Sequence, residues 1–244
     1  MPARHHRTVD RIVAILEEAA QGGSGVTLAE LATILDAPKS SIQELTNGLL
    51  AIGYLVEDER HFRLGPGPFV LSRRALSSSM RQVDHFELER THRHVKVPLF
   101  VGIRLGDDQV FIDQAGIDVL MDFVSSKHPR RPLLTTATGK VLLAYMPPAE
   151  RNEFLRRAER DRPGQVAEYL EELPEIRATA LAFNRGVSLP DRYAVATPLL
   201  DAQGELIAAI CAVIGPECAA ELSTVGQTLF EAVQLWHFPS YAEL

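Results

Sequence analysis

The stretch TLAELATILDAPKSSIQELTNGLLAIGYL, residues 27–55, decides the fold of the N-terminal part of the chain. Thr27 and Glu30 have the spacing of a capping box, in which each side chain accepts a hydrogen bond from the other residue's backbone N–H at the start of a helix. Apolar residues recur with helical spacing on both sides of Pro38, a residue that favours the first turn of a helix. These patterns predict two short helices that meet near Pro38.

The flanking residues extend the pattern in both directions. Upstream, residues 9–16 have the i, i+3, i+4, i+7 apolar spacing of an amphipathic helix. Downstream, two strand-like segments at 54–56 and 61–64 enclose the polar residues 57–60 and predict a hairpin. Three helices followed by a hairpin predict a winged helix-turn-helix, in which the third helix enters the major groove of DNA.

The polar side of the expected third helix and the hairpin carry groups suited to double-stranded DNA. Amide side chains can pair with adenine edges, whereas lysine, arginine and hydroxyl groups suit phosphates. The candidate DNA-contacting residues are Lys39, Ser40, Ser41, Gln43, Asn47, Arg60 and Arg63.

The charge of this segment favours an alternative, because small three-helix folds also dock proteins. Residues 1–64 contain six Lys and Arg against nine Asp and Glu, a net charge of −3. DNA-binding proteins gain most of their non-specific affinity by neutralising phosphates, and Glu44 lies on the helix expected to enter the groove. The pattern alone therefore leaves DNA binding and protein docking open, and it predicts weak non-specific DNA binding if DNA is the partner.

The whole chain of 244 residues has a formal net charge of −7, with 46% apolar and 23% charged residues. This length suggests one large or two small globular domains. Its two cysteines exclude a disulfide framework. The chain shows neither an apolar run long enough to span a membrane nor a signal peptide, so we expect a cytoplasmic protein with no membrane partner.

The clearest boundary is Gly65-Pro66-Gly67-Pro68. Beyond it, Phe69, Leu76 and Val83 recur every seven residues, which is typical of a helix that packs against another helix, although a helix lying on its own domain would fit equally. We expect a DNA-binding domain over 1–65, a linker helix over 66–94 and a third region over 95–244.

The C-terminal region mixes strands joined by turns with amphipathic helices. Antiparallel pairing with helices on the sheet faces predicts an α+β domain. The expected strands are 97–105, 109–114, 119–124, 193–200 and 206–214, and the expected helices are a short one ending before Pro147, then 149–160, 165–184 and a closing helix over 222–236.

Three segments resemble the isocitrate-lyase-regulator (IclR) family of bacterial transcription factors. They are PKSSI (38–42) through GYL (53–55), TTATGKVLLA (135–144), and ATPLLD (196–201) through Gly215-Pro216. The resemblance implies a winged helix-turn-helix, a linker helix that dimerises it, and a GAF- or profilin-like effector-binding domain. It also implies a homodimer or tetramer on a DNA operator, and it favours the dimerising interpretation of the heptad spacing.

Two positions depart from the family pattern. The family often has a basic residue where this chain has Glu44, which puts the mode of groove contact in doubt. It also has a longer acidic segment where only residues 187–192 precede Tyr193. We therefore expect an effector cavity that is more open or is shaped by other residues.

The segment Thr138-Gly139-Lys140 opens a helix, so free backbone N–H groups and a positive dipole end are available to a carboxylate. The alternative is that Thr136 or Thr138 merely caps this helix. The resemblance implies that this loop is part of the effector site. Where acid-binding members of the family carry hydroxyl side chains on the facing strand, this chain has apolar residues, so we expect a small organic acid or phenol with an apolar body. The candidate effector-binding residues are Met121, Phe123, Ala137, Thr138, Gly139, Asp191, Ala194, Ala212 and Ile214.

The sequence contains no arrangement typical of catalysis. No paired carboxylates, glycine-rich phosphate loop or nucleophile–histidine pair emerges, and Cys211 lies in an apolar strand. We expect no catalytic residue, metal or cofactor. The predicted function is a ligand-responsive DNA-binding repressor, with a small-molecule sensor that docks a protein as the alternative.

Overall fold

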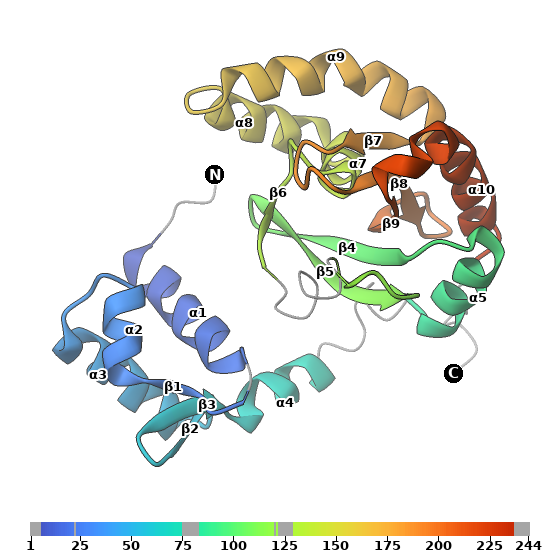
Figure 1. The fold of residues 1–244 in the computed structure, drawn as a ribbon. Helices are drawn as coiled ribbons and strands as arrows, with labels where there is room; N and C mark the ends of the chain where they lie inside the picture. Colours follow the sequence, from blue (N-terminus) through green and yellow to red (C-terminus); the bar gives the residue numbers. More distant parts are fainter. Residues whose placement is uncertain (1–5, 22, 75–82, 120, 122–128, 237–244) are drawn as a thin grey trace. The chain divides into compact units, whose positions relative to one another are not determined.

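The computed structural model describes residues 6–21, 23–74, 83–119, 121 and 129–236. The chain divides into two compact units at residue 78, and each is described by itself. Figure 1 shows the course of the chain through both.

The N-terminal unit is a winged helix-turn-helix, as the sequence predicts. Its elements are α1 (Arg7–Ala20), β1 (Val26–Thr27), α2 (Leu28–Ile34), α3 (Lys39–Ala51), β2 (Leu55–Asp58), β3 (His61–Leu64) and α4 (Pro66–Arg74). The capping box forms, with the Glu30 N–H donating to Thr27 Oγ1 at 3.3 Å and the Thr27 N–H donating to Glu30 Oε2 at 2.8 Å. Apolar residues from all three helices and the sheet make one core: Ile15, Ala19, Val26, Leu31, Ile42, Leu49, Leu55 and Phe62.

Within its described residues, the segment 66–94 contains α4 and a separate helix in place of the single linker helix that we expect. The second, α5 (His85–Val95), begins at Asp84, whose side chain accepts a hydrogen bond from the Phe86 N–H at 2.9 Å. Val83 precedes this cap and packs against the core of the C-terminal unit. The heptad position at Val83 therefore does not lie on a helical seam shared with Phe69, and Leu76 lies outside the described residues.

The C-terminal unit is an α+β domain built on an antiparallel sheet with the order β6-β5-β4-β9-β8-β7. Its elements after α5 are β4 (Leu99–Leu105), β5 (Asp108–Ala115), β6 (Arg131–Pro132), α7 (Ala137–Tyr145), α8 (Pro148–Ala158), α9 (Pro163–Thr179), β7 (Ala182–Arg185), β8 (Tyr193–Leu200), β9 (Leu206–Ile214), the 3-10 helix η2 (Pro216–Glu221) and α10 (Leu222–Gln234).

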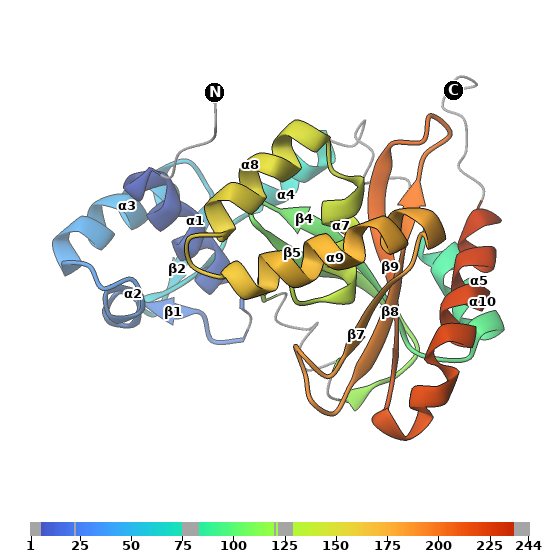
Figure 2. The same cartoon turned by 90° about the horizontal axis from the view of Figure 1, so that it is seen from above.

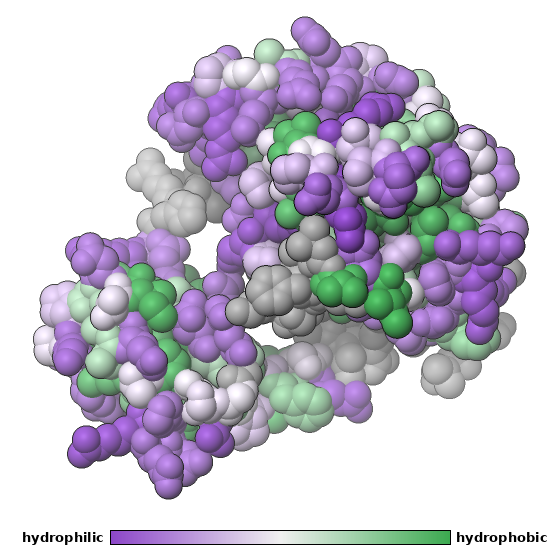
Figure 3. Space-filling model, in the orientation of Figure 1, coloured by the Kyte–Doolittle hydropathy of each residue, from purple (hydrophilic) through white to green (hydrophobic). Residues whose placement is uncertain are grey.

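Helices cover both faces of this sheet, and two separate apolar cores result (Figures 1 and 2). Helices α7, α8 and α9 pack on one face, with α7 next to the strands. Helices α5 and α10 pack on the other face. The outward surfaces of α8 and α9 are hydrophilic (Figure 3), as expected for helices that bury only one side.

Two expected elements are wrong. The helix expected to reach residue 184 ends at Thr179, because Ala180 adopts a left-handed conformation with φ of 58° and the chain enters edge strand β7. The strand expected over 119–124 is not formed at Val119 or Met121, which are helical, and residues 122–124 lie outside the described part of the chain.

Candidate functional site

The candidate DNA-contacting surface centres on α3. Lys39, Ser40 and Asn47 are exposed, while Ser41 and Gln43 are partly buried at the edge of the core. Pro38 precedes α3 and provides no side-chain cap, so backbone N–H groups at this helix start are available to a phosphate.

Two side-chain contacts order this surface. Gln43 Nε2 donates a hydrogen bond to Asn47 Oδ1 at 2.8 Å, which holds the two amides together one helical turn apart. Arg11 of α1 donates to Ser41 Oγ at 3.4 Å. Glu44 is exposed three residues before Asn47, so its carboxylate borders the amide pair.

The wing is the β2–β3 hairpin. Glu59 and Arg60 form its tip with φ angles of 47° and 65°, the left-handed conformation that tight hairpin turns require. Arg63 pairs with Asp58, with 3.4 Å between Nη1 and Oδ2. Among the described residues of the wing, Arg60 therefore has no ion-pair partner, whereas Asp58 partly neutralises the charge of Arg63.

The candidate effector site is a cavity between α7 and the sheet. About 30 Å³ of it is open to the centres of water molecules. It lies on the face that carries α7, and the loop between β7 and β8 contributes to its wall. Its lining consists of Phe111, Met121, Arg131, Thr136, Ala137, Thr138, Asn184, Ser188, Leu189, Arg192, Ala194, Cys211 and Val213.

The start of α7 is both capped and open to the cavity. Thr136 Oγ1 accepts a hydrogen bond from the Gly139 N–H at 3.0 Å and donates to the Pro132 carbonyl at 2.9 Å. The N–H groups of Ala137 and Thr138, both at the cavity, have no hydrogen-bond partner within the described ranges. Thr136 therefore supplies the cap, and Ala137 and Thr138 supply donors.

The other residues of the TTATGK segment have structural roles. A Cβ at Gly139 would lie 2.4 Å from the Cα and carbonyl oxygen of Leu133, so the expected binding role of Gly139 is corrected to close packing. Lys140 points away from the cavity, and its buried Nζ pairs with the Glu172 carboxylate of α9 at 2.7 Å.

On β9, the residues expected to contact the effector, Ala212 and Ile214, are each one position away from the residues that line the cavity. Side chains alternate between the faces of a strand, and Cys211 and Val213 line the cavity. Ala212 and Ile214 belong to the core on the opposite face, against α5 and α10. The expected Ala194 does lie at the cavity.

Of the remaining expected residues, Met121 lines the cavity and Phe123 lies outside the described residues. Asp191 does not line it, whereas its neighbour Arg192 does. Arg192 Nε donates to Asp118 Oδ2 at 2.7 Å, which ties the β7–β8 loop to the segment after β5. The short loop thus shapes the cavity through Ser188, Leu189 and Arg192.

Sequence reasoning missed Phe111, Asn184 and Arg131. Asn184 Nδ2 donates to the Thr135 carbonyl and its Oδ1 accepts from the Val187 N–H at 3.2 Å, so this side chain joins the loop to the start of α7. The basic pair Arg130-Arg131 beside Pro132 is the sequence signal that could have drawn attention to Arg131.

Cys211 has the chemistry of a buried apolar residue. Burial raises the pKa of its thiol to about 11, while a hydrogen bond with Thr138 and the positive charge of Arg131 act in the opposite direction. The thiol is therefore protonated near neutral pH and is a poor nucleophile.

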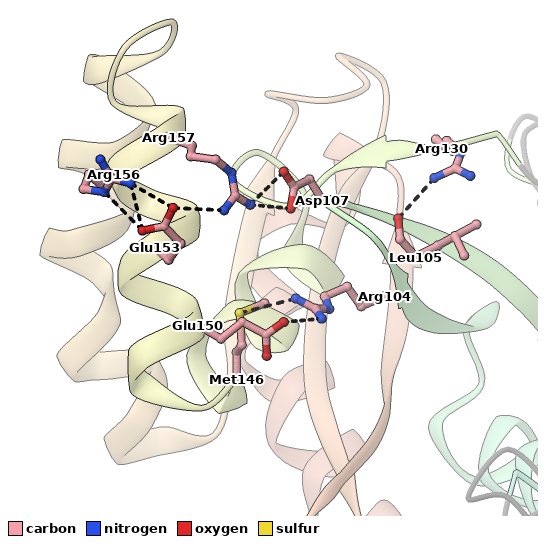
Figure 4. A network of polar contacts seen from close by, with 9 residues as sticks. All are labelled: Arg104, Leu105, Asp107, Arg130, Met146, Glu150, Glu153, Arg156 and Arg157. Carbon is pink, nitrogen blue, oxygen red and sulfur yellow. Dashed lines mark hydrogen bonds and ion pairs between the residues drawn. The ribbon is translucent and has the colours of Figure 1, made fainter. Parts of the chain in front are cut away.

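A network of charged side chains joins β4 and the β4–β5 turn to α8 (Figure 4). Arg104 of β4 pairs with Glu150 of α8, and Arg157 of α8 pairs with Asp107 in the β4–β5 turn at 2.8 Å. Arg130 donates to the Leu105 carbonyl at 3.2 Å. Arg130 directly precedes Arg131, the arginine that lines the cavity.

The described residues contain no group of three or more His, Cys, Asp or Glu side chains placed to hold a metal ion. Within the same part of the chain, every helix is too short or too polar to cross a lipid bilayer.

Several curated and solved proteins are similar to this chain. The HTH-type transcriptional regulator BhcR of Paracoccus denitrificans is 29% identical over 243 residues, which cover 93% of this chain and 85% of BhcR. The Pca regulon regulatory protein of Pseudomonas putida is 24% identical over 207 residues, covering 82% of this chain and 71% of that protein.

Among solved structures, an IclR transcriptional regulator from Alicyclobacillus acidocaldarius has a TM-score of 0.68 at 22% identity, covering 94% of this chain and 97% of that one. An IclR homolog from Microbacterium hydrocarbonoxydans, complexed with 4-hydroxybenzoate, has a TM-score of 0.64 at 18% identity. The match covers 93% of this chain and 99% of the homolog. These likenesses show a shared fold.

Family models match both units of the chain. The IclR helix-turn-helix domain matches residues 8–59, and the domain described as "Bacterial transcriptional regulator IclR C-terminal" matches residues 73–234. The protein is thus a transcriptional regulator and not an enzyme, and the chain belongs to the IclR family.

Proposed function

We propose that this protein is a cytoplasmic, ligand-responsive repressor that binds a double-stranded DNA operator as a homodimer or tetramer. In this proposal, a small organic acid or phenol with an apolar body occupies the cavity beside α7 and weakens operator binding. The observation that carries the proposal is the combination, in one cavity, of apolar walls with the two free N–H groups of Ala137 and Thr138.

The lining supports this class of ligand. Phe111, Met121, Ala194 and Val213 present apolar surface, which suits a ring or an aliphatic body. Free N–H groups at a helix start favour an anionic or hydrogen-bond-accepting oxygen. The 4-hydroxybenzoate held by the Microbacterium hydrocarbonoxydans homolog is a compound of this class.

The DNA-binding surface supports selective rather than general binding. Gln43 and Asn47 offer amide groups to base edges, and Lys39 with Arg60 offers charge to phosphates. With a net charge of −3 over residues 1–64, non-specific affinity is expected to be weak.

The second candidate is a small-molecule sensor whose N-terminal domain docks a protein. The exposed carboxylate of Glu44 beside the amide pair supports it, since this charge repels phosphates. This alternative shares the effector cavity and differs only in the partner of α3.

Fluorescence anisotropy separates the two candidates. The purified protein is titrated into labelled DNA that flanks its own gene and into scrambled DNA, at low and moderate salt. We expect specific binding that survives moderate salt and is reversed by a ligand acid, with a dimer or tetramer seen by light scattering. Absence of specific binding at both salt concentrations favours protein docking, and tighter binding on ligand addition contradicts the role as a repressor.

A further inference from the structure

Two guanidinium groups border the effector cavity, and they differ in their partners. Arg192 is paired with Asp118 at 2.7 Å. The guanidinium of Arg131 has neither an ion pair nor a hydrogen bond with any side chain or backbone group of the described residues. We infer that Arg131 is the receptor for a carboxylate of the effector, so that the cavity selects organic acids over neutral phenols. This inference rests on the proposed role of the cavity as the effector site.

The position of Arg131 suits this role. It lies on β6 opposite Gln109 of β5, partly buried, and its side chain lines the cavity. Cys211 of β9 lines the same cavity, and the charge of Arg131 lowers the pKa of its thiol against the larger effect of burial. Burial lowers the pKa of Arg131, but a guanidinium stays protonated in proteins.

A partly buried cation without a partner among the described residues is unfavourable unless an opposite charge comes from elsewhere. A second polar group without a partner among the described residues lies opposite Arg131 in the sheet, although it does not line the cavity. Gln109 is fully buried, and neither its Oε1 nor its Nε2 has a hydrogen-bond partner in the described part of the chain. A bound ligand can satisfy buried polar groups that the described residues leave without a partner.

The chemistry of the surrounding groups matches a carboxylate. A guanidinium can donate two parallel hydrogen bonds to one carboxylate, and this geometry is more selective than a point charge. The free N–H groups of Ala137 and Thr138 at the start of α7 add donors with a positive dipole end. The neighbouring Arg130 donates to the Leu105 carbonyl and does not line the cavity (Figure 4).

Calorimetry on the full-length protein tests the inference. The probes are benzoate and 4-hydroxybenzoate as acids, and benzamide and phenol as uncharged compounds of similar shape. The variants are Arg131→Gln, which keeps a polar group without charge, and Arg131→Lys, which keeps the charge without the planar fork. Arg130→Gln is the matched control, because this neighbouring arginine contacts a carbonyl outside the cavity.

We expect Arg131→Gln to weaken the binding of both acids by roughly 10- to 100-fold, the value of a charge-assisted hydrogen-bond pair, and to leave the uncharged probes unaffected. Arg131→Lys should retain part of the affinity, and Arg130→Gln should behave as wild type. The melting temperature of ligand-free Arg131→Gln should equal or exceed that of wild type, because the variant loses a cation that has no partner among the described residues. This result would show that the loss of binding is not caused by misfolding.

The inference is overturned if Arg131→Gln binds the acids as wild type does, if it loses acids and uncharged probes alike, or if wild type binds none of the acids at millimolar concentration. Failure of the proposed function gives a different result. In that case, acids bind through Arg131 but the protein does not bind its operator.

Discussion

Gln43 and Asn47 are hydrogen-bonded to each other through their side-chain amides on α3, with 2.8 Å between Gln43 Nε2 and Asn47 Oδ1. Each amide keeps hydrogen-bonding groups free for a base edge, and each orients the other. The pair therefore behaves as one recognition unit, in which the loss of either member disturbs both.

We expect Gln43→Ala and Asn47→Ala each to reduce discrimination between the operator and single-base variants by about 1–3 kcal/mol. Because the two side chains are coupled, the double variant should lose less than the sum of the single variants. Anisotropy titrations against a set of base-substituted operators measure both effects. Strictly additive losses would show that the amides contact DNA independently.

Arg63 and Asp58 on the wing provide a test of charge alone. Arg63→Ala should weaken binding to all DNA sequences similarly and lower the slope of log affinity against log salt by about 1 or less, since Asp58 already shields this arginine. Asp58→Asn should strengthen binding to all sequences. Both partners are exposed, so neither change should alter thermal stability measurably. A sequence-dependent effect of Arg63→Ala would assign it to base contact instead.

The cap of α7 predicts a loss of stability at Thr136. Thr136→Ala removes the acceptor of the buried Gly139 N–H, which should lower the free energy of unfolding by about 1–3 kcal/mol. Urea denaturation followed by circular dichroism measures the change. Thr135→Ala is the control, because only the backbone carbonyl of Thr135 accepts a hydrogen bond from Asn184. Equal effects of the two substitutions would contradict the cap.

Two helical glycines should respond in opposite directions to alanine. Gly139→Ala places a methyl group 2.4 Å from the Leu133 backbone and should lower the free energy of unfolding by about 1–3 kcal/mol. Gly164→Ala, near the start of α9, has open space around its Cβ and should be neutral or stabilise by up to about 1 kcal/mol. A neutral Gly139→Ala, measured by the same urea denaturation, would show that the α7–Leu133 contact is loose.

The thiol of Cys211 predicts a pH dependence of stability. Its pKa is raised from an ordinary 9.0 to about 11 in the folded protein, so the unfolded chain loses this proton first as pH rises. The free energy of unfolding should therefore fall by roughly 2–3 kcal/mol between about pH 9 and pH 11 through this group. Denaturation curves of Cys211→Ala should lack this part of the decline, whereas those of Cys218→Ala should retain it. Parallel curves for wild type and Cys211→Ala would contradict the prediction.

The sequence allowed the N-terminal domain to be predicted well because its signals are local. The capping box at Thr27 and Glu30, the break at Pro38 and the polar tip of the hairpin each act within a few residues, and all are found in the structure. Strand β7 was not predictable in this way. Ala180 ends α9 in a left-handed conformation without a glycine, so the chain carries no local signal that the helix stops.

The effector cavity depends on contacts that local patterns do not encode. Strand β9 is apolar at every position because both sheet faces are covered, so periodicity cannot distinguish the face of Cys211 from that of Ala212. Likewise, the place of Arg131 at the cavity follows from the pairing of the two-residue strand β6 with β5, which brings together distant parts of the chain.

The strand order has a consequence for how a ligand can be sensed. Arg131 comes from β6 and Asn184 from β7, the two opposite edges of the sheet, yet both line the same cavity. The sheet therefore curls so that its two edges approach each other at the cavity, and an occupant that contacts both residues bridges these edges. Ligand binding and the curvature of the sheet are then thermodynamically linked. Any event that flattens the sheet or curls it more tightly also changes the affinity of the cavity for its ligand.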